Sequence, residues 1–244
     1  MIMDTNKNKM QVEIWSDVMC PFCYIGKRRF EKAQAQFSEK ENIEIVWKSY
    51  QLAPNMKTDT NKNIHQYLSE HKGISLQNAK QMNDRVTQMA AKDGLTYNFD
   101  KAIVANSLNA HCFAHFAKQY NKQDEAEEKL FHAYFTEGKN TDDIHILIQL
   151  GTEIELDPIA LKSALESGLY AKEVMADIQE GQELGVRGVP FFIFDRKYAV
   201  SGAQETQVFM QTLEKSFAEW QKENQHIKLE VSDGPTCSAD GVCE

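Results

Sequence analysis

Two cysteines separated by two residues carry the clearest chemistry in this chain. Cys20 and Cys23 enclose Pro21 and Phe22. Residues three apart at a helix start share one face, and their spacing suits the ~4.4–6.8 Å between Cα atoms that a disulfide needs. Proline suits the first helical position, so Cys20 takes the N-cap, where free N–H groups and the helix dipole favour its thiolate. The spacing predicts a redox pair in which Cys20 attacks and the more buried Cys23 resolves the mixed disulfide.

The elements around the pair decide between redox chemistry and zinc, since zinc sites use the same spacing but need two further ligands. Residues 11–16 alternate apolar and polar side chains, as a strand does. From Cys20 to about Glu39 the apolar residues recur at helical spacing, and residues 43–50 form a second strand. Strand, helix and strand within about forty residues predict a βαβ unit with two parallel strands. A cysteine pair at its strand-to-helix turn favours redox chemistry.

A helical block of different composition follows the βαβ unit. Residues 64–184 are rich in Ala, Gln, Lys, Glu and Leu, and they contain no convincing strand. We expect about five or six helices here, with starts at Asp157-Pro158 and at Thr141, where a capping side chain precedes the first turn. The apolar positions of this block are expected to pack helices together, with a part of them lining a substrate groove.

A second chemical feature lies where the strands resume. Residues 190–194 and 198–201 predict a hairpin with a polar turn between them, and a last helix is expected over 205–222. Pro190 opens the first of these strands, where proline need not donate to the ladder. If the Val189–Pro190 bond is cis, the loop exposes the Val189 backbone to an extended substrate; if it is trans, Pro190 only starts a strand. The cysteine pair favours the cis interpretation.

Together these motifs resemble the DsbA-like branch of the thioredoxin superfamily, and its FrnE-like members in particular. Residues 15–27 are similar to the redox motif of that family, and residues 188–192 are similar to its cis-proline loop. Residues 106–111, Asn-Ser-Leu-Asn-Ala-His, are similar to a segment of its helical domain. The resemblance covers about residues 11–222. It implies an α/β, thioredoxin-like fold with an inserted all-α helical domain and a groove between the two.

The resemblance also implies a division of the chain and a set of site residues. A thioredoxin-like domain is expected in two parts, at 11–62 and 185–225, around a helical domain at 63–184, with a tail at 226–244 that holds a second cysteine pair. The expected catalytic residues are Cys20, Cys23 and Pro190, and the expected substrate-binding residues are Pro21, Phe22, Val189, Asn106 and His111.

Two other functions stay open at this point. The same fold houses glutathione-dependent 2-hydroxychromene-2-carboxylate isomerases and kappa-class glutathione transferases, which resemble this chain around Asn106 and His111. Those proteins typically carry serine where this chain has Cys20, so the presence of both Cys20 and Cys23 favours disulfide exchange over isomerisation of a small molecule. The third candidate is a redox-sensing, chaperone-like binding protein.

The remaining cysteines admit several interpretations. Cys237 and Cys243 are close enough in sequence to form a disulfide, either as a second redox pair or as a passive bridge, or to remain two free thiols. Some FrnE-like proteins are similar in carrying an extra C-terminal pair. Cys112 lies on an apolar helical stretch and is expected to be a small buried hydrophobic residue.

Polar residues near the motif receive weaker assignments. Asp17 is a candidate to handle protons for Cys23. Residues 27–29, Lys-Arg-Arg, follow the pair on the same helix and are expected to form a solvated face. His111 and His115 are one turn apart, which is weak evidence for a metal site without a nearby acidic partner.

Composition and charge limit the partners. The net charge of −9 repels phosphate backbones, so nucleic-acid binding is not expected, and no apolar run approaches the ~20 residues that span a bilayer. The polar N-terminus lacks the apolar core of a secretory signal, which predicts a cytoplasmic protein. No resident cofactor or metal is expected, and the partners expected are protein or peptide thiols and disulfides, glutathione or a thioredoxin-type reductant. In a reducing compartment the exchange can run as reduction or isomerisation as well as oxidation.

Overall fold

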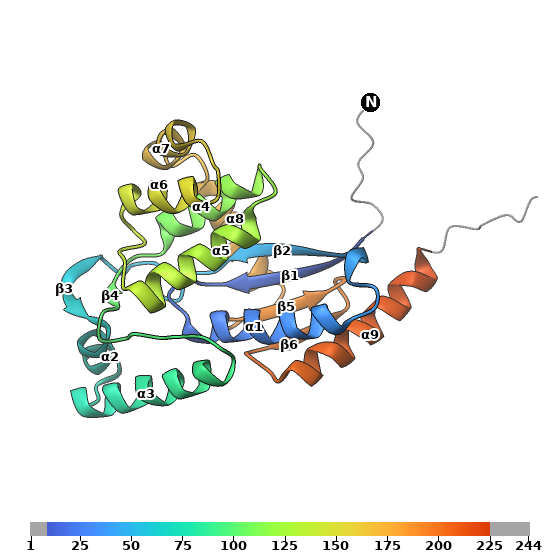
Figure 1. Cartoon of the computed structure of the whole chain (residues 1–244), viewed down its shortest axis with the longest axis horizontal. Coiled ribbons are helices and arrows are strands. Elements are labelled where there is room, and N and C mark those ends of the chain that lie inside the picture. The colour runs from blue at the N-terminus through green and yellow to red at the C-terminus, as the bar shows by residue number, and fades with distance from the viewer. Residues whose placement is uncertain (1–8, 225–244) are drawn as a thin grey trace, which may run out of the picture.

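A computed structural model describes residues 9–224, which fold into a layered α/β structure (Figure 1). Helices α1 (Pro21–Gln36) and α9 (Thr206–Glu223) pack together over one face of a four-stranded sheet. Helix α8 (Ala171–Glu183) packs against the sheet from its other face. The other long helices belong to the segment between the second and third strands of this sheet, which agrees with the predicted α/β fold with a helical insertion.

The sheet has the strand order β2-β1-β5-β6. β1 (Met10–Ser16) pairs in parallel with β2 (Ile43–Ser49), and α1 connects the two. β5 (Phe191–Phe194) runs antiparallel to β1, and β6 (Tyr198–Ser201) runs antiparallel to β5. The predicted βαβ unit and hairpin are therefore confirmed, and β1 and β5 lie side by side although the whole insertion separates them in the sequence.

Alternation along β1 divides the core between the two faces of the sheet. Val12 and Ile14 join the main core, where Phe192 lies against Phe30 of α1 and Phe209 of α9 with ring centroids 5.6 Å and 4.6 Å apart. Burying aromatic rings of this size stabilises a fold by about 1.5–3 kcal/mol each. The face that holds α1 and α9 is thus fixed by aromatic packing.

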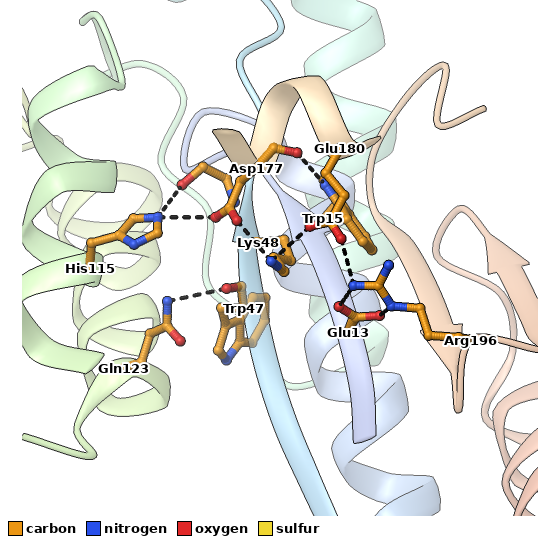
Figure 2. Close-up of polar contacts among 10 residues, drawn as sticks. Glu13, Trp15, Trp47, Lys48, His115, Gln123, Asp177, Glu180 and Arg196 are labelled. Carbon is orange, nitrogen blue, oxygen red and sulfur yellow. Dashed lines mark hydrogen bonds and ion pairs between the residues drawn. The ribbon is translucent and has the colours of Figure 1, made fainter. Parts of the chain in front are cut away.

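The opposite face of β1 contacts α8 through polar groups as well as apolar ones. The Trp15 indole N–H donates to the Asp177 carbonyl at 2.9 Å, and Trp15 is fully buried. Figure 2 shows the Asp177 carboxylate between His115 of α4 (Leu108–Lys118) and Lys48 of β2, at 3.0 Å from each. These contacts hold α8 against the sheet, and α8 leads directly into the loop that carries Val189 and Pro190.

The insertion contains more helices than the sequence indicated. Seven α-helices lie within residues 64–184, all of which the structure describes, where five or six were expected. Asp157 is the N-cap of α7 (Pro158–Glu166), as predicted. The N-cap of α6 (Ile144–Glu153) is Asp143 rather than Thr141, because the Asp143 carboxylate accepts from the N–H of His145 at 2.8 Å. The helices not yet named are α2 (Ile64–Lys72), α3 (Leu76–Lys92) and α5 (Gln123–His132), with a π-helical turn at Ala133–Glu137 and a 3₁₀ turn at Lys40–Asn42.

The expectation of no strand in residues 64–184 is wrong in one place. β4 (Ile103–Val104) pairs with β3 (Asp59–Asn63) in a small separate sheet. Two residues are too short to show the alternation that marks a strand, and the polar β3 sequence lacks it as well. The insertion therefore contains one short strand among its helices, and that strand pairs with β3 just ahead of the insertion.

The expectation of a solvated face at residues 27–29 is also wrong. Lys27 is 2% exposed and its ammonium lies among the carboxylates of Glu31, Asp124 and Glu128. Arg29 is buried too, and it donates to Asp93 at 2.8 Å. Arg28 pairs with Glu128 as well, so all three basic residues fasten α1 to the insertion, with partners on α5 and at the end of α3.

The expectations about membrane spans and about the second cysteine pair remain. Among residues 9–224 no helix has the length and apolar character that crossing a membrane requires. Cys237 and Cys243 lie outside the described residues, so their pairing stays a prediction.

Candidate active site

The cysteine pair stands at the junction of β1 and α1. Cys20 is the N-cap of α1 with an extended backbone, and Pro21 takes the first helical position, as predicted. The Cys20 N–H donates to the Asp17 carbonyl at 2.9 Å, and the Cys23 N–H donates to the Cys20 carbonyl at 3.0 Å. These bonds form a tight turn that places both thiols, each of them free, on the same side of the helix start.

The loop between α8 and β5 closes over Cys20. The Val189–Pro190 bond is cis, and the Cys20 thiol donates to the Val189 carbonyl at 3.5 Å. The ring of Pro190 packs on α1 at Gly26, where a Cβ would lie 3.0 Å from the proline Cγ. Glycine at position 26 thus allows the loop to approach the helix closely, and Val189 presents its backbone beside the N-terminal cysteine.

The two thiols differ in what surrounds them. Burial, the hydrogen bond with Cys20 and the charge of Cys20 together raise the pKa of Cys23 well above its usual value, against the smaller lowering effects of Asp17 and Ser16. Cys20 borders an open cleft and Cys23 does not. The arrangement can therefore offer one sulfur to an incoming partner and hold the other, protonated, behind it.

Beside Cys20 lies a cleft of about 700 Å³ between the start of α1 and the α2–α3 hairpin. Its lining is mainly apolar, and four of the large apolar side chains exposed on the molecule belong to it. The expected site residues Pro21, Phe22 and Val189 line this cleft together with Cys20. The four exposed side chains are Phe22, Leu52, Met82 and Met89.

Asp17 and His111 form a buried acid–imidazole pair next to the cysteine turn. Asp17 is fully buried and its carboxylate accepts from the N–H of Leu52 at 2.7 Å. His111 bonds through Nε2 to the Tyr50 carbonyl at 2.9 Å and lies 3.6 Å from Asp17. Burial opposes a charge on His111, but the contacts with Asp17 prevail and raise its pKa. This pair ties the cysteine turn to the segment that carries Leu52 into the cleft.

Asn106 and His111 do not line the cleft. The Asn106 amide donates to the Met56 carbonyl at 2.7 Å and its oxygen accepts from the Leu108 N–H at 2.9 Å. It therefore holds the segment before β3 and the start of α4. The contacts of Asn106 and His111 with substrate stay predictions. In the structure both side chains bond the protein itself, Asn106 at Met56 and Leu108 and His111 at Tyr50.

The contribution of the α2–α3 hairpin was missed from the sequence. Met82, Val86 and Met89 of α3 line the cleft at intervals of four and three residues, which is the period of a helix face. That periodicity was visible, but nothing in the sequence indicated that this face looks toward Cys20. Cys112 was placed correctly, since it is buried and burial raises its pKa to about 11.

No metal centre accompanies this site in the described part of the chain, where no three His, Cys, Asp or Glu side chains are placed to share an ion.

Comparison with known proteins decides the family. The model of the DSBA-like thioredoxin domain matches residues 11–214. The chain belongs to the DSBA-like thioredoxin domain family. The uncharacterized protein YwbO of Bacillus subtilis is 30% identical over 219 residues, which are 87% of this chain and 98% of YwbO.

Solved structures agree with this family. A probable DsbA oxidoreductase from Streptomyces coelicolor is 33% identical, with 96% of this chain and 98% of that chain covered and a TM-score of 0.81. A 2-hydroxychromene-2-carboxylate isomerase shares only the fold, at 16% identity and a TM-score of 0.60 over 88% of this chain and 98% of that one. The DsbA-like fold thus holds for the chain, and the chemistry within it must be argued from the site.

Proposed function

We propose that this DsbA-like protein is a thiol–disulfide oxidoreductase that exchanges disulfides with protein or peptide substrates through Cys20 and Cys23. The observation that carries the proposal is the asymmetry of the pair. Cys20 caps α1 and borders the cleft, and Cys23 lies behind it with a raised pKa. Two-step disulfide exchange requires a nucleophile that a substrate can reach and a protected second thiol, and Cys20 meets the first need by bordering the cleft although little of its surface is exposed.

In the reducing direction the Cys20 thiolate attacks one sulfur of a substrate disulfide. The substrate S–S bond breaks, one substrate sulfur leaves as a thiolate, and a mixed disulfide joins Cys20 to the other. Cys23 then loses its proton and attacks the Cys20 sulfur, so that the substrate leaves fully reduced and the protein carries the Cys20–Cys23 disulfide. After this reduction, glutathione or a thioredoxin-type reductant is the proposed partner that restores the dithiol. In the oxidising direction the same steps run backward: two substrate thiols become a disulfide, and the Cys20–Cys23 disulfide becomes the dithiol.

The cleft and the Val189–Pro190 loop fit an extended substrate. The Val189 carbonyl lies 3.5 Å from the Cys20 sulfur, close enough to align a backbone beside the reacting atom. Strand-like pairing with such a backbone gives affinity that does not depend on sequence, and apolar walls select the side chains. Pro21, Phe22 and Val189 are the proposed substrate contacts, and Pro190 keeps the loop against α1.

Reduction of insulin by dithiothreitol, followed by turbidity, tests the proposal. We expect Cys20→Ser to lose more than 95% (about a twentyfold loss or more) of the activity of the chain, because no other described thiol borders the cleft. Cys23→Ser is expected to accumulate a mixed disulfide on Cys20 that mass spectrometry detects. Cys112→Ser is the matched control and should keep full activity.

The rival function predicts a different pattern. A glutathione-dependent isomerase or transferase would turn over a small molecule only with glutathione, and its activity would survive Cys23→Ser. Unchanged insulin reduction in Cys20→Ser, or glutathione-dependent turnover that survives Cys23→Ser, would contradict the proposed function.

A further inference from the structure

The charged residues that line the cleft are all basic, although the chain as a whole carries a net charge of −9. Lys72 at the end of α2 and Arg85 in the middle of α3 line it, and His71 lies beside them. No aspartate or glutamate is among the lining residues. The charge of the lining is therefore opposite in sign to the net charge of the chain, and apolar walls strengthen the effect of such charges.

Arg85 also lacks the carboxylate partner that three other arginines have within the described residues. The chain contains five arginines, of which Arg28, Arg29 and Arg196 are in ion pairs within the protein. Arg85 has no carboxylate partner within the described residues, and neither has Arg187. An unpaired guanidinium keeps all its donors for a carboxylate outside the protein, which it can bind in a bidentate way.

Of the two unpaired arginines, Arg85 lines the cleft and Arg187 lies in the loop next to it. Arg85 is exposed on α3, and Arg187 is exposed in the loop just before Gly188 and Val189, which line the cleft. A segment lying along Val189 therefore lies in the same cleft as Lys72 and Arg85, and Arg187 is two residues from Val189 in the sequence. The same cleft carries the exposed apolar side chains of Phe22, Met82 and Met89.

We propose that the cleft selects, as substrates of the proposed disulfide exchange, protein segments in which apolar residues next to the reacting cysteine are flanked by glutamate or aspartate. The apolar residues cover the methionine-rich walls, and the carboxylates pair with Lys72, Arg85 and Arg187. Glutathione shares the carboxylates but has no apolar side chain to cover those walls, so the proposal commits to a protein segment. This inference rests on the proposed function, since it concerns what reaches Cys20.

The test uses four mixed disulfides with thionitrobenzoate, whose release is followed by absorbance. Three are peptides with the same Leu-Cys-Phe centre and flanks of two Glu, two Gln or two Lys residues, and the fourth is glutathione. The quantity compared is the rate constant that depends on Cys20, obtained by subtracting the rate of Cys20→Ser. We expect the Glu peptide to react at least ~10-fold faster than the Lys peptide at low salt, with a difference that shrinks as salt screens the charges.

Charge reversal in the cleft supplies the decisive comparison. Lys72→Glu with Arg85→Glu should abolish or invert the order of the peptides. The matched control is Lys92→Glu with Lys118→Glu, which makes the same change in net charge at two exposed lysines that do not line the cleft. The control should keep the order of the unmodified chain.

The outcomes separate this inference from the proposed function. If thionitrobenzoate release does not depend on Cys20, the proposed function fails. If release depends on Cys20 but the three peptides react alike, or if the control variant shifts their order as much as the cleft variant does, the charge selection is wrong and the function stands. If glutathione reacts as fast as the Glu peptide and loses as much in the cleft variant, the occupant is a small carboxylate thiol, and the protein-segment proposal is overturned.

Discussion

Three ionisable side chains are buried behind the cysteines. Asp17, His111 and Glu127 are each at most 3% exposed. His111 Nδ1 and Glu127 Oε2 have no hydrogen-bond partner in the described structure. Each buried polar atom without a partner lowers the free energy of unfolding by about 1–3 kcal/mol, so these two atoms destabilise the fold close to the cysteine turn. Asp17 connects these groups to the site: its backbone carbonyl accepts from the Cys20 N–H, and its carboxylate lies 3.6 Å from His111.

Glu127 is a buried carboxyl with a raised pKa. Burial, helped by Asp124 and Asp17 and opposed by His111 and Lys27, raises its pKa to about 7. A carboxyl whose pKa is higher in the folded state stabilises the fold fully below its unfolded value of about 4.3, and this contribution is lost as the pH rises through about 7. Glu127→Gln should therefore match the parent chain near pH 4 and exceed its stability by about 3 kcal/mol at pH 8.

Urea unfolding at several pH values measures this difference. Glu128→Gln is the matched control, because burial alone would raise the pKa of Glu128 but its contacts with Arg28 and Lys27 lower it. The control should lose stability at pH 8, where Glu127→Gln gains it. A Glu127→Gln variant with the same pH profile as the parent would show that this carboxyl is not the buried acid of the site.

At the element scale, the close packing of α8 on β1 depends on a residue without a side chain. Gly181 lies against the buried indole of Trp15, and a Cβ there would come within 2.7 Å of the indole nitrogen and 2.9 Å of the adjacent carbon. The indole cannot give way easily, because it is fully buried and its N–H is bonded to the Asp177 carbonyl. Gly181 therefore sets the distance between α8 and the sheet.

Gly181→Ala should destabilise the protein by about 1–3 kcal/mol, the usual cost of overpacking. Since α8 leads into the loop of Val189 and Pro190, a shift of this helix should also slow the reaction of Cys20. Thermal unfolding and the rate of Cys20 alkylation measure the two effects. Gly188→Ala is the control for stability, because a Cβ at that position meets no atom within 4 Å and should leave the melting temperature unchanged.

Features held by contacts between residues close in sequence were predicted correctly, and those held by contacts between distant residues were not. The N-cap at Cys20, the cap at Asp157 and the β5–β6 hairpin follow from bonds between residues a few positions apart, and the sequence predicted them. The prediction that Lys27 is solvated was wrong. Its partners Asp124 and Glu128 are about a hundred residues away in the sequence, so no local pattern indicated them. Local patterns carry no information about such pairs.

The candidate site divides in the same way. Residues 20–23 and the Val189–Pro190 loop were found because each has a local signature. The wall formed by α3 was not found, since Met82 and Met89 show that a helix has an apolar face but not what that face meets. The resemblance to DsbA-like proteins implied a groove, and the basic residues along it became visible only when α2 and α3 were placed beside Cys20.

At the scale of the whole molecule, the inserted helices and the sheet are joined by buried polar contacts rather than by apolar packing alone. Asp177 receives hydrogen bonds from the Ser49 N–H, His115 and Lys48, each at 3.0 Å, and so links α8, β2 and α4 (Figure 2). Lys48 and Arg196 also meet Glu180, which extends the network to the β5–β6 hairpin. One carboxylate therefore connects three parts of the chain that position the cleft.

Removing that carboxylate should loosen the whole assembly. Asp177→Ala leaves the Ser49 N–H, His115 and Lys48 without their shared acceptor, and breaking a buried pair in this way costs about 3–5 kcal/mol. The value expected here is near 3 kcal/mol, because Lys48 keeps Glu180 as a partner. Asp84→Ala is the matched control, since Asp84 is exposed on α3, and its stability should change by less than about 0.5 kcal/mol.

The same contacts give the effect a defined pH dependence. Burial alone would raise the pKa of Asp177, but the bonds from His115, Ser49 and Lys48 prevail and lower it. A carboxyl with a lowered pKa in the folded state stabilises the fold above its unfolded value of about 3.9, and the contribution is lost as the pH falls through the folded value. Urea unfolding should therefore show a large gap between the parent and Asp177→Ala at pH 7 that narrows below pH 4. A gap that stays constant down to pH 3 would mean that Asp177 acts through packing alone, and that its charge does not join the insertion to the sheet.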